Sequence, residues 1–173
     1  MTILVAGIGN VFLGDDGFGV EVARQLALRP MPAGVVVRDF GIRSFDLAFA
    51  LDSAELIILV DAAPRGGEPG TLYAIEPDLE NLGEAGGPDP HAMDPVAVLR
   101  LAREMHVTPG RLLLVGCEPE TFGPENEGAM ELSPRVQAAV ARAADWFESI
   151  VADSVRAGQW RATDRIAEIG LAS

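Results

Sequence analysis

Short apolar runs alternate along the chain with segments whose apolar residues follow helical spacing. Four runs have the length and character of strands that are buried on both faces of a parallel sheet: Ile3–Gly7, Val35–Asp39, Leu56–Asp61 and Arg111–Gly116. A fifth segment, Gly70–Glu76, alternates apolar and polar residues, so we expect it to be an edge or antiparallel strand.

Helices are predicted between these strands. Apolar residues recur at i, i+3, i+4 and i+7 from Gly19 and again from Val98. Asp94-Pro95 and Ser133-Pro134 each combine an N-cap residue with proline at the first helical position. The second pair begins the longest predicted helix, whose apolar stripe is Val136, Val140, Ala143, Phe147 and Ile150. The alternation predicts the α/β class, with a three-layer, twisted, mainly parallel sheet of about five strands covered by helices on both faces.

Length and composition indicate one domain. A chain of 173 residues, 49% of them hydrophobic, can bury a single core, which we place in residues 1–153, followed by a tail over 154–173. The stretch 77–93 is rich in Gly, Pro and acidic residues and is predicted to be a long surface loop. No apolar run is long enough to span a bilayer, and the first residues do not resemble a secretory signal.

The charge narrows the choice of partners. A formal net charge of −13 disfavours nucleic acid and anionic membrane surfaces, because both repel an acidic protein. A single cysteine cannot form an internal disulfide, which is consistent with a cytoplasmic location. The sequence leaves the oligomeric state open.

Acidic residues follow three of the predicted strands. Asp16, Asp39 and Asp61 lie at or just beyond strand ends, where ligands of open parallel sheets collect. A dinucleotide is one candidate ligand, with Asp39 on a ribose hydroxyl. However, Phe12 stands where the fingerprint requires a third glycine, and two adjacent carboxylates would repel a pyrophosphate. A cation fits this crevice better.

His91 is the candidate third ligand, because it lies in the acidic loop ahead of a predicted helix. Two carboxylates with an imidazole suit zinc or nickel better than calcium or magnesium. Simpler interpretations stay open. Asp15 or Asp16 can cap a helix that begins near Gly17, Asp61 can accept a loop hydrogen bond, and His91 can be an exposed loop residue.

Nucleophilic catalysis has weaker support. Cys117 ends the last predicted strand and could pair with His91, although a lone cysteine there is more often a packing residue. Ser44 and Ser133 have the pattern of helix caps, and neither stands in a nucleophile elbow.

Three motifs in order, "GIGNVFLGDDGFG", "LVDAAPRGGEPGTLY" and "PHAMDPVAVL", make the chain resemble the hydrogenase maturation proteases. The resemblance runs from Ile3 to about Val151. It implies an endopeptidase that removes the C-terminal extension from the nickel-loaded precursor of a nickel-iron hydrogenase large subunit. It also implies that Asp16, Asp61 and His91 are metal-binding and catalytic, that the nickel is carried by the substrate, and that no organic cofactor is needed. The family often has glutamate at the position of Asp16.

The resemblance leaves the mechanism and the specificity open. A metal-polarised carbonyl, a metal-activated water and acid assistance by Asp16 and Asp61 are all chemically reasonable. This chain departs from the family's "DGGTxG"-like segment: Asp39 and Gly41 are retained, whereas Ile42, Arg43 and Ser44 differ. We therefore expect these five residues to contact the substrate. The alternatives are a metallochaperone or maturation scaffold that does not cleave, and a nucleotide-dependent α/β enzyme.

Overall fold

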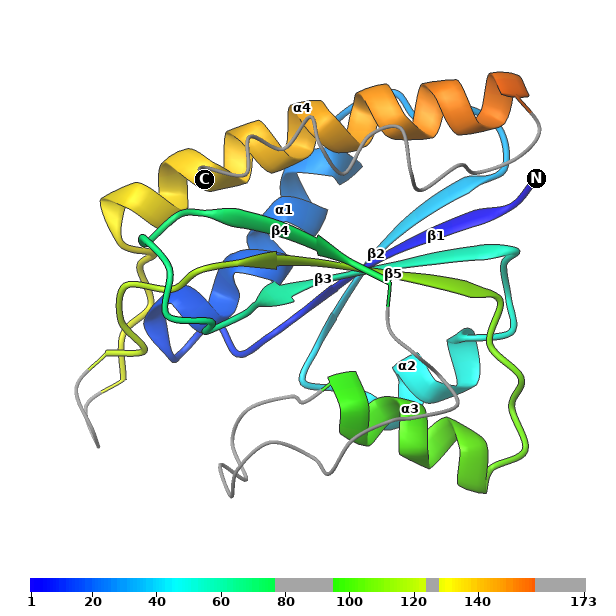
Figure 1. Cartoon of the computed structure of the whole chain (residues 1–173), viewed down its shortest axis with the longest axis horizontal. Helices are drawn as coiled ribbons and strands as arrows, with labels where there is room; N and C mark the ends of the chain where they lie inside the picture. Colours follow the sequence, from blue (N-terminus) through cyan, green and yellow to red (C-terminus); the bar gives the residue numbers. More distant parts are fainter. Residues whose placement is uncertain (77–94, 124–127, 158–173) are drawn as a thin grey trace.

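Five strands form one twisted sheet in the order β2-β1-β3-β5-β4 in the computed structural model, which describes residues 1–76, 95–123 and 128–157 (Figure 1). The strands are β1 (Ile3–Ile8), β2 (Val35–Gly41), β3 (Leu56–Ala62), β4 (Leu72–Ile75) and β5 (Arg111–Cys117). β1 pairs with β2 and β3 in parallel, and β3 pairs with β5 in parallel. β4 is antiparallel to β5 at the edge of the sheet, which confirms the expectation for this segment.

Helices cover both faces of the sheet, as predicted. Helices α1 (Phe18–Ala27) and α4 (Pro134–Ala157) lie on one face, and α2 (Ser44–Ala50) and α3 (Pro95–Glu104) lie on the other (Figure 1). A short 3-10 helix, η1 (Gly14–Gly17), leads from the loop after β1 into α1. All four parallel strands therefore end at the same side of the molecule, which we call the carboxyl edge.

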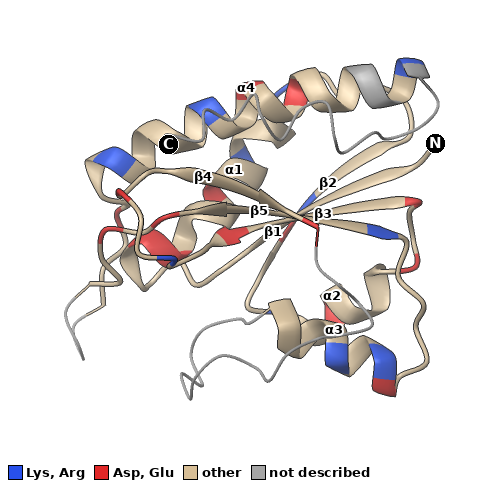
Figure 2. Ribbon diagram, viewed as in Figure 1, with Lys and Arg blue, Asp and Glu red and all other residues tan. Residues whose placement is uncertain are grey.

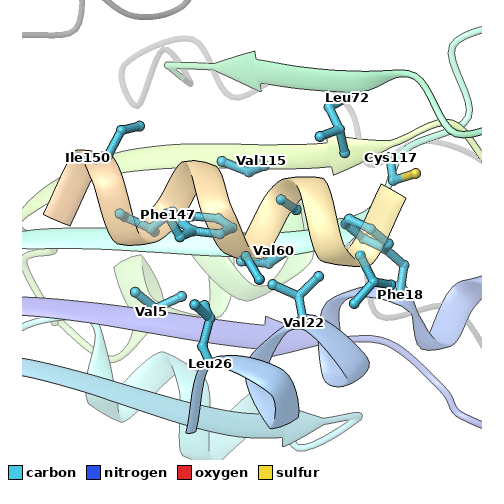
Figure 3. Close-up of a cluster of buried hydrophobic side chains, with 14 of the residues drawn as sticks. Val5, Phe18, Val22, Leu26, Val60, Leu72, Val115, Cys117, Phe147 and Ile150 are labelled. Carbon is cyan, nitrogen blue, oxygen red and sulfur yellow. The ribbon is translucent and has the colours of Figure 1, made fainter. Parts of the chain in front are cut away.

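The apolar runs become two cores because the sheet is buried on both faces. Alternate residues of β1, β3 and β5 pack against α1 and α4 on one side and against α2 and α3 on the other. The expectation that Val35–Asp39 is buried on both faces is wrong, because β2 is an edge strand and its residues through Asp39 are exposed or half-buried. Figure 3 shows the first core, where Phe18 of α1 and Phe147 of α4 meet Val60 of the sheet. The predicted apolar stripe of α4 is fully buried there.

Two glycines allow α1 to lie directly against the sheet. A methyl group on Gly19 would overlap the carbonyl oxygen of Val60, and one on Gly7 would overlap the carbonyl oxygen of Gly19. The backbones of α1, β1 and β3 therefore touch without intervening side chains. Phe12, by contrast, is exposed to solvent and takes no part in this helix–strand contact.

Some boundaries differ from the sequence predictions. Only the cap pattern at Ser44 pointed to α2 in the sequence. The helix begins at Ser44 itself, with Arg43 as the N-cap residue and no side-chain cap bond, so the capping role expected for Ser44 is wrong. α4 continues through Ala157, and the expected division at residue 153 stays a prediction. The acidic loop 77–93 and most of the tail lie outside the described residues. In the described part of the chain, no helix is long and apolar enough to cross a membrane.

Candidate functional site

Two buried acids lie at the carboxyl edge, Asp16 in the connection after β1 and Asp61 near the end of β3. Asp16 lies in η1, directly after the β1 loop, and its side chain accepts a hydrogen bond from the backbone N–H of Asn10 at 2.6 Å. Asp61 is the residue after Val60, which pairs with Gly7 of β1. Only 6% of Asp16 and 5% of Asp61 is exposed. The expected convergence of these two acids is what the parallel pairing of β1 and β3 produces.

Gly9 lies against the backbone of Asp16 and near the Asp61 carboxylate. It has a positive φ of 125°, and a methyl group there would overlap the Asp16 carbonyl oxygen and come within 3.7 Å of the Asp61 Oδ1. Any other residue at this position would be strained and would collide with the backbone of Asp16. Two carboxylates alone suit hard cations, so recognition of a borderline cation would need the imidazole as well.

The loop after β1 is not arranged to bind a phosphate. Its backbone N–H groups are already donated within the protein: Gly9 to the Gly41 carbonyl at 3.0 Å, Asn10 to Asp16, Phe12 to the Asn10 Oδ1 at 3.0 Å, and Leu13 to the Asn10 carbonyl at 3.0 Å. A phosphate-binding loop needs such groups to point at the ligand. The geometry therefore argues against a nucleotide in this loop.

Asp15 has a structural role that its sequence position does not reveal. Its fully buried carboxylate accepts hydrogen bonds from the backbone N–H groups of Glu120, Thr121 and Ser133 at 2.8, 3.0 and 2.7 Å, and from the Ser133 hydroxyl at 2.9 Å. It makes no cap bond to α1. Asp15 thus connects η1 to the segment between β5 and α4, and the Ser133 hydroxyl donates one of the hydrogen bonds of this connection.

Glu118 is a further buried acid that was not singled out in the sequence. It is 5% exposed and accepts hydrogen bonds from the Tyr73 hydroxyl at 2.7 Å and from the backbone N–H groups of Arg65 and Gly66. Burial acts to raise its pKa, but the Tyr73 and backbone hydrogen bonds outweigh burial and lower the pKa below its ordinary value. Burial, with the bond to Glu118, raises the pKa of Tyr73 to about 12. Glu118 therefore holds the loop that follows Asp61.

Cys117 has the properties of a packing residue. Its side chain is fully buried in the core between the sheet and α4, and burial is the main cause that raises the pKa of its thiol to about 12. A nucleophilic cysteine requires accessible thiolate. The structure thus favours the packing interpretation over the catalytic one.

The segment 39–44 borders a cavity at the carboxyl edge. The cavity has a volume of about 370 Å³ and lies between the loop after β1, with Gly9 and Phe12, and the end of β2, with Asp39, Gly41 and Ile42. The side chains of Ile42 and Arg43 are each 60% exposed, and Arg24 approaches Asp39 at 3.7 Å across the opening. Of the five expected substrate-contacting residues, four line this cavity, and Ser44 follows them at the start of α2.

The third expected ligand cannot be placed, because His91 lies outside the described residues. Among the described residues, no group of three or more His, Cys, Asp or Glu side chains is arranged to hold a metal. The described part of the site is therefore a carboxylate pair, with acidic segments gathered at this end of the molecule (Figure 2).

The fold is that of an open α/β sheet, and the carboxylate pair lies at the carboxyl edge, where proteins of this class bind their ligands. The sequence model of the family described as hydrogenase maturation protease matches residues 20–150, so the chain belongs to the hydrogenase maturation protease family.

Known relatives and solved structures agree with this assignment. The hydrogenase expression/formation protein HupD of Rhodobacter capsulatus is 35% identical over 68% of this chain, and the chain spans 57% of that relative. The hydrogenase 2 maturation protease of Escherichia coli K12 is 29% identical, with 81% of this chain and 84% of the relative covered. The E. coli hydrogenase maturating endopeptidase HybD has a similar structure, with a TM-score of 0.73, 27% identity and coverage of 91% and 94%.

Proposed function

We propose that this protein is an endopeptidase that removes the C-terminal extension from the nickel-loaded precursor of a nickel-iron hydrogenase large subunit. Family membership and the names of the relatives support the reaction class. The observation that supports the site assignment is the pair of buried acids, Asp16 and Asp61, at the carboxyl edge, where Gly9 lies against the Asp16 backbone and near the Asp61 carboxylate. The reaction would take place in the cytoplasm, with nickel arriving on the substrate.

Asp16 and Asp61 are proposed to contact the substrate's nickel together with His91. Both carboxylates are anchored by a backbone N–H, from Asn10 and from Ala62 respectively, so at least one oxygen of each has a fixed direction. Such fixed donors recognise a metal without the cost of ordering flexible side chains. An empty precursor would offer them nothing to bind, which would make cleavage depend on nickel.

Hydrolysis then requires three events at the scissile bond. Water adds to the carbonyl carbon, the carbon–nitrogen bond breaks, and the released amine receives a proton. Asp16 and Asp61 are the candidate groups that accept a proton from the attacking water and deliver a proton to the leaving amine. Polarisation of the carbonyl by the substrate's metal would assist the attack.

Mass spectrometry of the precursor tests this function. Nickel-loaded and nickel-free large-subunit precursors from the same organism are incubated with the wild type, Asp16→Asn, Asp61→Asn and His91→Ala. Asp52→Asn, which changes an exposed acid far from the carboxyl edge, is the matched control. We expect loss of a C-terminal peptide only from the nickel-loaded precursor, only with the wild type and the control.

Two results would contradict parts of the proposal. An intact but tightly bound precursor would indicate a scaffold that does not cleave. Equal cleavage of nickel-free precursor would show that cleavage does not depend on recognition of the metal by the carboxylates.

We further propose that Asp39, Gly41, Ile42, Arg43 and Ser44 contact the substrate. Exchange of this segment for that of another family member should change which precursor is cleaved.

A further inference from the structure

Several exposed apolar side chains lie in the segments that follow the carboxyl ends of the strands. Among the described residues, eight large hydrophobic side chains are exposed, and five of them follow the carboxyl ends of strands. We call these five the carboxyl-edge rim: Phe12 (59% exposed), Ile42 (60%), Phe45 (63%), Phe122 (41%) and Met130 (73%). Of the other three, Leu28, at the end of α1, and Val36, near the start of β2, lie at the opposite end of the strands, and Phe49 lies in the last turn of α2. Clustered apolar exposure of this kind marks an interaction surface.

Backbone hydrogen bonds hold the rim in place across three connections. Ala129 N–H donates to the Phe12 carbonyl at 2.8 Å, and Asp15 N–H donates to the Thr121 carbonyl at 3.0 Å. Gly9 N–H donates to the Gly41 carbonyl, next to Ile42. The segments after β1, β2 and β5 are therefore joined to one another. A surface that is ordered before binding loses little entropy on association.

Two residues of this rim, Phe12 and Ile42, line the cavity described above. Phe12, Val20, Phe40 and Ile42 give it apolar walls, and Arg24 and Arg43 lie at its margin. Its volume of about 370 Å³ is at the small end for ligand sites, which suits one or two side chains rather than a large cofactor. Gly9 also lines it, so the cavity and the carboxylate pair share a wall.

We propose that the carboxyl-edge rim docks the folded large-subunit precursor, and that the cavity between Phe12 and Ile42 receives an apolar side chain of its C-terminal extension. This inference rests on the proposed function and names the surface that the precursor uses. The occupant follows from continuity, because whatever covers the rim must also cover Asp16 and Asp61. A second copy of this chain is disfavoured, because it would bring another charge of −13 to an acidic edge.

Affinity measurements test the rim separately from cleavage. Immobilised nickel-loaded precursor is titrated with the wild type, Phe12→Ser, Ile42→Ser and Met130→Ser. Leu28→Ser is the matched control, because Leu28 is equally apolar, 89% exposed and distant from the carboxyl edge. Each rim variant should bind about tenfold more weakly or worse, as expected for apolar anchors at an interface, and the control should match the wild type. All four side chains changed are exposed, so circular dichroism should show unchanged folding.

The outcomes separate this inference from the proposed function. Weaker binding by the rim variants supports the rim even if the wild type cleaves nothing, in which case only proteolysis fails. Cleavage by the wild type with equal affinities for all variants overturns the rim and leaves proteolysis intact. Absence of binding by the wild type, or a dimer in light scattering that the rim variants abolish, also overturns the rim as a precursor surface.

The cavity has its own test. Precursors in which each apolar residue of the extension is replaced in turn by Asp are titrated against the wild type and Ile42→Ser. One replacement should weaken binding to the wild type about tenfold and have a much smaller effect with Ile42→Ser, because both changes disrupt the same contact. Additive effects at every position would overturn the assignment of the cavity.

Discussion

Asp15 and Asp16 are adjacent in the chain but have different roles in this fold. The Asp15 carboxylate accepts four hydrogen bonds from the segments before α4, whereas Asp16 points to the loop after β1. The difference arises because η1 turns the two side chains in different directions. One residue joins parts of the molecule, and the other faces the candidate site.

Asp15→Asn should therefore lower stability. The amide replaces one acceptor oxygen with an NH₂ group that faces backbone donors, so buried N–H groups lose their partner. We expect the free energy of unfolding to fall by about 1–3 kcal/mol, measured by urea denaturation. Asp52→Asn, at an exposed site, should change it little. Equal stability of the two variants would show that the Asp15 bonds contribute nothing net.

Glu118 gives a stability that depends on pH. Because folding lowers its pKa, its contribution is present above its ordinary value of 4.5 and is lost as the pH falls through the lower value of the folded protein. Glu118→Gln should thus be less stable than the wild type near neutral pH, by about 1–3 kcal/mol. The difference between the two should shrink below pH 4.5. A difference that is constant over pH would contradict this account.

At the scale of elements, the position of α1 against the sheet depends on the absence of side chains at two glycines. Its contact with β1 and β3 is backbone against backbone at Gly7 and Gly19. No side chain can be added there unless the helix moves away from the sheet, and such a shift would also displace η1 and Asp16.

Gly19→Ala is a direct test of this contact. Alanine should gain about 1 kcal/mol of helix propensity over glycine, yet the overlap with Val60 should cost more and leave a net loss of at least about 1 kcal/mol in the free energy of unfolding. Ala141→Gly, at an exposed position of α4, measures the propensity difference in the same protein. If Gly19→Ala were stabilising, the helix would have more room than the structure shows.

Most elements could be predicted because their signals are local. The buried strands are continuous apolar runs, and α4 begins at the Ser133-Pro134 signal. α2 escaped prediction because it has only seven residues, and two of its aromatic residues, Phe45 and Phe49, face solvent instead of forming an apolar stripe.

The candidate site was predictable only in part. Asp16 and Asp61 could be placed together because parallel strand ends share one edge. The roles of Asp15 and Glu118 could not be inferred, because their partners are backbone N–H groups and two hydroxyl groups between 45 and 118 residues away in the chain. Tertiary structure alone brings such groups together.

For the molecule as a whole, the excess of acid has a measurable effect on stability. With a net charge of −13, repulsion opposes the compact state, and salt screens it. Salt also weakens the exposed ion pairs, such as Arg29 with Asp145 and Glu148, but each of these contributes at most about 1 kcal/mol.

We expect repulsion to outweigh these pairs. The free energy of unfolding should rise by about 1 kcal/mol when sodium chloride is raised from about 0.05 M to about 0.5 M. Sodium chloride is preferred to sulfate, because sulfate also strengthens apolar burial. A fall in stability with salt would show that the ion pairs dominate.

The position of β2 at the margin of the sheet bears on how the protein behaves at high concentration. In the described part of the chain, no strand pairs with its outer edge, and it begins with three consecutive valines. Arg38 and Asp39 follow at once and project to opposite faces of the strand, which is how natural proteins discourage such pairing. At the other margin, β4 is only four residues long. The same short, charged borders that complete this sheet thus protect it from aggregation through its edges.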